Sequence, residues 1–286
     1  MDIKELHAFI TVADVNSVSL AAELIHITQP AVSKRIASLE SQLGSSLFDR
    51  VGRQLKITEA GMAFLPLARN ILQTVEDGKK AVQNLTSEVI GDLRLGTSHH
   101  IGLHRLPPVL RRFSQDFEKV NLQLHFNDSE IIIEKVLHGQ LDIGVVTLPE
   151  RTIEHLGQFL AWTDKLHFVI GRNIPIKKTV SMADLAGMRS VLPEKGTVTR
   201  DILEDKLRTE GVALKETLST NYLETIKMMV GVGLGWSILP ETMLSDELQT
   251  FKVKGLQLSR NLGLVYDTRR TLPNSAKTFI RLIQSQ

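Results

Sequence analysis

The sequence contains no cysteine among its 286 residues. This absence excludes disulfides, thiolate metal sites, cysteine nucleophiles and thiol redox switches. Long apolar segments are lacking too, because charge or glycine interrupts every hydrophobic run short of the roughly 18 residues that a membrane-spanning helix needs. Residues 1–5 lack the basic start and apolar block of a secretory signal peptide. We therefore expect a cytoplasmic protein that does not enter a membrane.

Neither sign of charge is in large excess, since the net charge is only +2. Overall charge therefore neither favours nor excludes a nucleic-acid partner. Apolar residues make up 42% and charged residues 23%, which is typical of a soluble globular protein. At roughly 100–200 residues per domain, the length allows two or three domains. Within residues 28–58, basic residues outnumber acidic ones, which is a modest local basic patch.

The first 44 residues predict three helices. Ser17 or Ser19 can cap the second helix, and the adjacent Ala21 and Ala22 indicate a close approach to a neighbouring helix. Thr28 is the expected N-cap of the third helix, which Gly44 ends. The buried positions expected for the first and third helices are Leu6, Phe9, Ile10 and Ala13, and Val32, Ile36, Leu39 and Leu43.

Two short helices joined by a tight connection predict a helix-turn-helix. The second helix of the pair must enter a major groove, so its exposed first turns need short side chains that form hydrogen bonds. Gln29 and Ser33 meet this requirement, and Pro30 lies in the first turn, where its missing N–H costs nothing. Lys34 and Arg35 can neutralise flanking phosphates.

Alternating apolar positions in residues 47–58 predict a small hairpin, or wing. Arg50, Arg53 and Lys56 lie on it and can contact DNA. The alternative is a helical segment with a basic hairpin that binds no DNA. Spacing alone leaves both interpretations open.

A long helix is expected from Thr58 to about Val89. Its apolar residues recur at spacings of mostly three and four, at positions 65, 68, 72, 75, 82, 85 and 89. A stripe of this length favours pairing with the same helix of a second copy. The alternative is packing within the helix's own domain.

Taken together, these residues resemble the winged helix-turn-helix of LysR-type transcriptional regulators. The motifs that carry the resemblance are Ser17 with Ala21-Ala22, Thr28-Gln29-Pro30-Ala31-Val32-Ser33, Ile36, Leu39-Glu40, Leu43-Gly44, Leu47-Phe48-Asp49-Arg50 and Thr58-Glu59-Ala60-Gly61. Lys34-Arg35 departs mildly from the family, which more often has arginine followed by a polar residue.

The resemblance implies a bacterial, sequence-specific DNA-binding regulator that a small molecule controls. It places Gln29, Pro30, Ser33 and Lys34 at bases or adjacent phosphates of double-stranded promoter DNA. Arg50 and Arg53 of the wing would contact the DNA backbone or minor groove. It also implies a homodimer or homotetramer that pairs through the linker helix, with a contact to RNA polymerase in reach.

Beyond a hinge at residues 88–92, strands alternate with helices, which predicts α/β sheets. We expect a winged helix-turn-helix domain at residues 1–58, a linker helix at 59–90 and an α/β effector-binding domain at 91–286. The chain would cross between two lobes near residues 161–163 and return near 263–266. Lobe I would then comprise residues 91–161 and 266–286, and lobe II residues 162–265. The family resemblance implies the same two-lobed fold, similar to periplasmic binding proteins.

Polar residues that follow strands or open helices mark the expected effector cleft. They are Thr97, Ser98, His99, His100, Asp128, Ser129 and Thr147 of lobe I, and Thr197, Thr199 and Asn221 of lobe II. Such a cleft favours a small polar or anionic metabolite. The alternative is that the hydroxyl groups only cap helices.

His99, His100 and His104 form a cluster, and two imidazoles one helical turn apart can bind zinc. With no cysteine available and only a conjectural third ligand, Asp128, we assign no metal and no cofactor. Histidines that assist anion binding or respond to pH are the favoured interpretation. The glycines at positions 231, 233 and 235 fail the nucleotide-loop pattern, because Trp236 stands where glycine is needed.

We find no catalytic constellation in the sequence, so no enzyme activity is expected. The alternative function is a cytoplasmic solute-binding protein or a cleft enzyme with an unrelated helical N-terminus.

Overall fold

The computed structural model describes residues 1–51, 54–86, 88–214 and 216–285. These residues divide into two compact units, Met1–Leu85 and Thr86–Gln286, which are described separately. No helix among the described residues is both long and apolar enough to cross a membrane.

The first unit begins with the three predicted helices, α1 (Ile3–Val15), α2 (Val18–Leu24) and α3 (Gln29–Leu43). Asp2 caps α1 in a capping box with Glu5, and the Ser17 hydroxyl accepts a hydrogen bond from the amide of Leu20, so Ser17 is the cap of α2. Gly44 ends α3 with φ +68°, a left-handed conformation that glycine adopts without strain.

The core of the first unit confirms the close approach of α2, because Ala21 and Ala22 are buried with Val12, Val32 and Ile36. Leu6, Phe9 and Leu39 form a second cluster that α4 covers. Leu43, which was predicted to be buried, is exposed, because the last turn of α3 extends past this core.

The predicted wing is present as β1 (Phe48–Val51) and β2 (Gln54–Ile57), which pair antiparallel. Glu40 of α3 accepts a hydrogen bond from the amide of Leu47 at 2.7 Å and so fixes the entry to the wing. The Thr58 hydroxyl donates to the carbonyl of Ser46 at 2.7 Å and accepts from the amide of Gly61. One threonine therefore both closes the hairpin and starts the next helix.

The long helix α4 runs over Glu59–Gln83, so its predicted end near Val89 is wrong by six residues. Asn84 and Thr86 follow, and such side chains compete for backbone hydrogen bonds and disfavour helix. The apolar residues of the predicted stripe on α4 do not all pack in the same way. Leu65, Ala68 and Leu72 pack on the first unit's own core, as the alternative interpretation held. Leu85 lies beyond the helix and is exposed.

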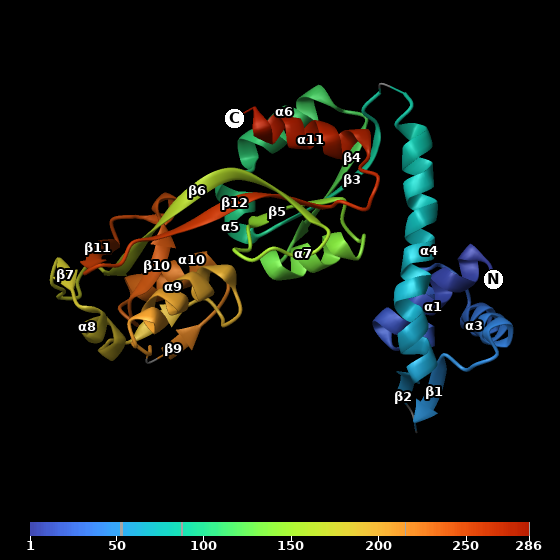
Figure 1. Ribbon diagram of the computed structural model, residues 1–286, viewed down its shortest axis with the longest axis horizontal. Helices are drawn as coiled ribbons and strands as arrows, with labels where there is room; N and C mark the ends of the chain where they lie inside the picture. The colour runs from blue at the N-terminus through green and yellow to red at the C-terminus, as the bar shows by residue number, and fades with distance from the viewer. Residues whose placement is uncertain (52–53, 87, 215, 286) are drawn as a thin grey trace. The chain divides into compact units, whose positions relative to one another are not determined.

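The second unit contains a mixed sheet in which the strand order is β4-β3-β5-β12-β6 through its first half. The strands β3 (Gly91–Thr97), β4 (Val120–Phe126) and β5 (Ile143–Thr147) are parallel, and β5 is buried along its whole length. The helices α6 (Pro107–Asp116) and α11 (Asn274–Gln284) cover one face, and α7 (Ser129–Leu137) covers the other (Figure 1).

The sheet continues into a second half around β6 (Leu156–Gly171), which pairs there with β10 (Ser237–Pro240) and β11 (Leu248–Val253). β8 (Ser190–Leu192) and β9 (Glu216–Ser219) pair parallel in a separate two-stranded sheet of this lobe. The remaining elements of the lobe are β7 (Thr179–Val180), α8 (Met182–Gly187), α9 (Val198–Thr209), α10 (Leu223–Gly231) and the short 3₁₀ helix η1 (Glu241–Met243).

Two long antiparallel strands, β6 and β12 (Leu258–Asp267), connect the two lobes (Figure 1). On β6, Trp162 packs on the core of lobe I and Leu166 on that of lobe II. On β12, Leu258 packs in lobe II but Leu262 already packs in lobe I. The return crossing therefore precedes the predicted residues 263–266, because Leu262–Val265 pair with β5.

Candidate functional site

The first candidate site is the outer face of α3. Gln29, Pro30, Ser33 and Lys34 are exposed and Arg35 is half-buried. The opposite face is anchored by the buried Val32, Ile36 and Leu39. Short polar side chains therefore project from a rigidly held helix start, which is the arrangement that a major-groove reading helix requires.

Fewer of the basic side chains proposed to contact DNA are described on the wing than on α3. The backbone of Arg50 pairs with Leu55, and Lys56 is exposed. The side chain of Arg50 and the whole of Arg53 lie outside the described residues, so their DNA contacts stay predictions.

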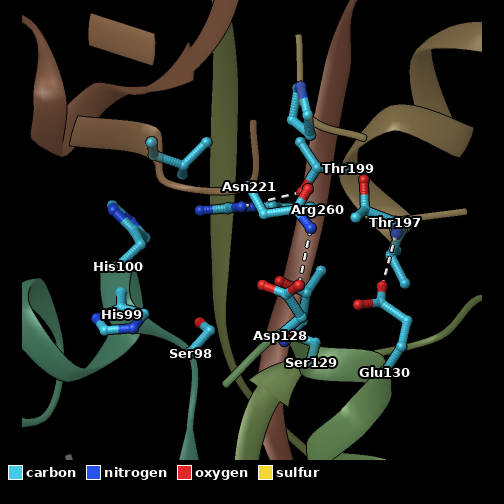
Figure 2. Close-up of a pocket in the computed structure, with 14 residues that line it drawn as sticks. Ser98, His99, His100, Asp128, Ser129, Glu130, Thr197, Thr199, Asn221 and Arg260 are labelled. Atoms are coloured by element: carbon cyan, nitrogen blue, oxygen red, sulfur yellow. Dashed lines mark hydrogen bonds between the residues drawn. The ribbon is translucent and has the colours of Figure 1, made fainter. Parts of the chain in front are cut away.

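The second candidate site is a cavity of about 60 Å³ between the two lobes. Lobe I lines it from α5 (His99–His104), α7 and the strand ends, and lobe II lines it from the start of α9 and the start of α10. Figure 2 shows the side chains of both lobes converging on this space. The lining residues are Ser98, His99, His100, Asp128, Ser129, Glu130, Thr147, Pro193, Thr197, Val198, Thr199, Asn221, Leu223 and Arg260.

Every predicted cleft residue lines this cavity except Thr97. The Thr97 side chain is buried in the sheet, where its hydroxyl donates to the carbonyl of Val145 at 2.9 Å. His99, two residues after Thr97, begins the short helix α5.

The alternative role of the cleft hydroxyls, helix capping, does not hold for Ser98 and Thr197. Each stands at an N-cap position without a side-chain capping hydrogen bond. Thr197 instead donates to the carbonyl of Glu194 at 2.8 Å. Thr199 accepts from Arg260 at 3.0 Å, and Ser129 accepts from the amide of Thr147 at 3.0 Å.

Two of the hydrogen bonds between the lobes join the start of α7 to lobe II across the cleft. The Asn221 side-chain amide donates to the Asp128 carboxylate at 2.7 Å, and the backbone amide of Val198 donates to Glu130 at 2.9 Å (Figure 2). We call these two bonds the latch. Both carboxylates belong to the start of α7 and both donors belong to lobe II, so the latch forms only when the lobes are closed.

A buried ionic cluster lies directly behind the cleft. Asp164 of β6 contacts Arg105 and lies 3.3 Å from a guanidinium nitrogen of Arg260, and Nε2 of His100 lies 3.6 Å from its carboxylate. The side chains of Asp164 and Arg260 are only 1% and 4% exposed. Unpaired charges at such depth would be strongly destabilising, so the cluster is held by mutual compensation.

The ionic cluster shifts the pKa values of its members. Burial alone would raise the pKa of Asp164, but His100 and the two guanidinium groups outweigh it and hold that pKa well below the usual range. Burial lowers the pKa of His100, although the neighbouring Asp164 opposes the shift. Asp164 is therefore ionised, and His100 favours its neutral form.

Five lining residues were not predicted from the sequence: Glu130, Pro193, Val198, Leu223 and Arg260. A signal for Arg260 was available, because it occupies an inward position between Leu258 and Leu262 of an alternating strand. A charged residue at such a position indicates a buried ion pair or a site. Asp128, the conjectured metal ligand, is engaged by Asn221 instead.

Comparisons with known proteins cover both units of the chain. A model described as bacterial regulatory helix-turn-helix protein, lysR family, matches residues 3–62, and one described as LysR substrate binding domain matches residues 86–286. The HTH-type transcriptional regulator YwqM of Bacillus subtilis (strain 168) is 32% identical over 259 residues, which cover 90% of this chain and 88% of YwqM.

Solved structures show the same fold. A full-length OxyR variant from Pseudomonas aeruginosa superimposes with a TM-score of 0.73 at 21% identity, over 99% of this chain and 95% of that one. CbnR, solved with its target DNA, gives a TM-score of 0.67 at 21% identity, over 100% and 99% of the two chains.

These matches span both units, so the alternative of an unrelated helical N-terminus is wrong, and so is that of a cleft enzyme. The winged helix-turn-helix, the long helix and the two-lobed α/β unit are those of a DNA-binding regulator, and the chain belongs to the LysR family of transcriptional regulators.

Proposed function

We propose that the chain recognises promoter DNA through the exposed start of α3 and that a small polar or anionic metabolite in the interlobe cleft controls this binding. The DNA contacts are assigned to Gln29, Pro30, Ser33, Lys34 and Arg35 of α3 and to Arg50 and Arg53 of the wing. The observation that best supports DNA recognition by α3 is that its polar start is exposed, while the opposite face of the helix is buried. CbnR, which shares the fold, was solved on its target DNA.

The charge of the cleft favours an effector with an anionic group. Two guanidinium groups, those of Arg105 and Arg260, face the single carboxylate of Asp164. Arg260 lines the cavity, and its Nε atom has no hydrogen-bond partner among the described residues, so an anionic group of an effector can bind there. On the opposite wall, Asp128 and Glu130 can accept hydrogen bonds from hydroxyl or amino groups of the same molecule.

The size of the cavity implies that the lobes move. Its volume of about 60 Å³ is less than half that of an engineered protein cavity of roughly 150 Å³ that binds benzene. A metabolite of more than a few heavy atoms therefore enters only when the lobes separate and the latch breaks. The effector then replaces the latch contacts and sets the degree of closure, which is a population shift between two states.

Oligomerisation is proposed to occur through α4. Leu67, Ile71 and Val82 are exposed and lie close to one line on this helix, apart from the residues that pack on its own unit. A second copy of α4 would cover this line and give a homodimer, which can pair further into a homotetramer. Such an assembly places two winged units on one promoter and within reach of RNA polymerase. It would act in the cytoplasm, where a bacterial promoter lies.

The proposal is tested by fluorescence anisotropy of the full chain on the DNA upstream of its own gene and on scrambled DNA, at two salt concentrations. We expect preference for the upstream DNA and an affinity that falls steeply as salt rises. Equal affinity for both sequences at every salt concentration would refute promoter recognition by α3.

A further inference from the structure

Two imidazoles and one carboxylate meet at the edge of the cleft. His100 and His104 lie one turn apart on α5, and Glu224 lies in the first turn of α10. One potential ligand atom from each of the three lies within 4.8 Å of the others. Nε2 of His104 is 3.4 Å from Glu224, and the two imidazole centroids are 4.8 Å apart. The histidines belong to lobe I and the glutamate to lobe II.

We propose that His100, His104 and Glu224 bind a divalent transition-metal ion such as Zn²⁺, and that this ion fastens the two lobes in the closed state. Two imidazoles and a carboxylate are a common ligand set for zinc, with the fourth position left to water. Glu224 is the third ligand that the sequence alone did not supply. The inference goes beyond the proposed function, because metal binding needs neither DNA nor the metabolite.

The distances fit such a site after a small side-chain adjustment. Ligand atoms roughly 2.0–2.1 Å from a tetrahedral zinc ion lie about 3.4 Å from one another. The present separations reach 4.8 Å, so the ligands need to move inward by little more than 1 Å. The side chains of His104 and Glu224 are 32% and 40% exposed, which leaves both free to change rotamer.

The surroundings of His100 support ligation. Its side chain is buried, and neither ring nitrogen has a hydrogen-bond partner among the described residues. Asp164 lies 3.6 Å from Nε2, in the position of the carboxylates that commonly orient metal-bound histidines.

The competing explanation is an ordinary ion pair between His104 and Glu224, which needs no metal and contributes little at a partly exposed site. A second pair in the same unit serves as a reference for that behaviour. His138 and Glu134 lie 3.8 Å apart on an exposed surface, with no second imidazole in their cluster among the described residues.

The test is calorimetric titration of ZnCl₂ into the chelator-treated full chain, repeated with His104→Ala, Glu224→Gln and the control His138→Ala. We expect one site per chain in the wild type and in the control, weakened at least about tenfold by either cluster substitution. With Co²⁺ in place of Zn²⁺, the wild type and the control should show visible d–d absorption that His104→Ala loses.

Three results would overturn the proposal. One is the absence of a wild-type site. Another is a site that persists unchanged in His104→Ala and Glu224→Gln. The third is a site lost in His104→Ala but fully retained in Glu224→Gln, which would remove the bridge between the lobes. Thermal unfolding of each metal-free variant, with a Tm near that of the wild type, confirms that the partly exposed positions tolerate substitution.

Discussion

The two units use their polar side chains in opposite ways. On α3, Gln29 and Ser33 are exposed, and the packing beneath them depends only on apolar residues. Behind the cleft, Asp164 and Arg260 are buried and compensate each other's charge. Function and stability are therefore separable in the winged unit and coupled in the effector unit. Substitutions that probe the two regions should reveal this difference.

The largest expected effect is the loss of unfolding free energy caused by Arg260→Met. This change leaves Asp164 with less compensation at a buried position, and breaking a buried ion pair typically costs about 3–5 kcal/mol. Thermal or urea unfolding of the effector unit would measure the loss. As a control, Arg208→Ala removes an exposed pair with Asp205 and should cost less than about 1 kcal/mol. Equal losses in the two variants would contradict the coupling between charge and stability.

Stability in the winged unit should depend on packing instead. A Cβ added at Gly61 would lie 2.3 Å from the carbonyl oxygen of Leu47, at the junction of α4 and the wing. We expect Gly61→Ala to destabilise the first unit by about 1–3 kcal/mol, as overpacking does. Gly78→Ala on the same helix meets nothing within 4 Å and should be neutral or stabilising. Unfolding followed by circular dichroism distinguishes them, and a harmless Gly61→Ala would disprove the close approach.

Substitution of the exposed α3 residues should change binding without changing stability. Gln29→Ala and Ser33→Ala each remove a proposed base contact, worth about 1–3 kcal/mol of discrimination between upstream and scrambled DNA. Their unfolding free energies should stay within about 0.5 kcal/mol of the wild type. Arg53→Ala, by contrast, should weaken binding to both DNAs similarly. If all three variants lost specific and non-specific binding equally, the base-contact assignment would fail.

The smallest expected effect is on the pH dependence of stability, through the buried carboxylate of Asp267. Burial alone would raise the pKa of Asp267, but hydrogen bonds from the side chain and amide of Arg269 lower it. A lowered pKa stabilises the fold above the unfolded-state value of about 4, and this contribution disappears as the pH falls through the folded-state pKa. The Tm of the wild type should therefore fall more steeply in acid than that of Asp267→Asn. Parallel curves would show that Asp267 does not contribute.

The winged unit could be predicted from sequence because its determinants are local. Caps such as Ser17 and Gly44 and the spacing of Val32, Ile36 and Leu39 act within a few residues. The end of α4 was predicted too late, because an apolar spacing continued past the residues that end the helix.

The cleft was predicted in outline only. Residues at strand ends and helix starts, such as Ser98 and Asn221, can be located from the α/β pattern. Glu224 could not, because its role depends on a partner 120 residues distant in the chain. The alternating strand indicates that Arg260 is buried, but not that it pairs with Asp164, 96 residues away. Thr97 follows the predicted pattern at the end of a strand, but its hydroxyl donates to the carbonyl of Val145 within the sheet and does not face the cleft.

The central claim is that closure of the cleft in one unit controls DNA binding by the other. Asn221→Asp tests it, since a carboxylate placed against Asp128 replaces a latch hydrogen bond with repulsion. The matched control, Asn121→Asp, breaks a similar 2.8 Å bond to Asp92 that lies wholly within lobe I.

The decisive measurement is the affinity of both variants for the upstream DNA by fluorescence anisotropy. We predict that Asn221→Asp shifts the affinity by about fivefold or more, the lower range of allosteric coupling, and that Asn121→Asp binds like the wild type. Wild-type affinity in Asn221→Asp would contradict the account.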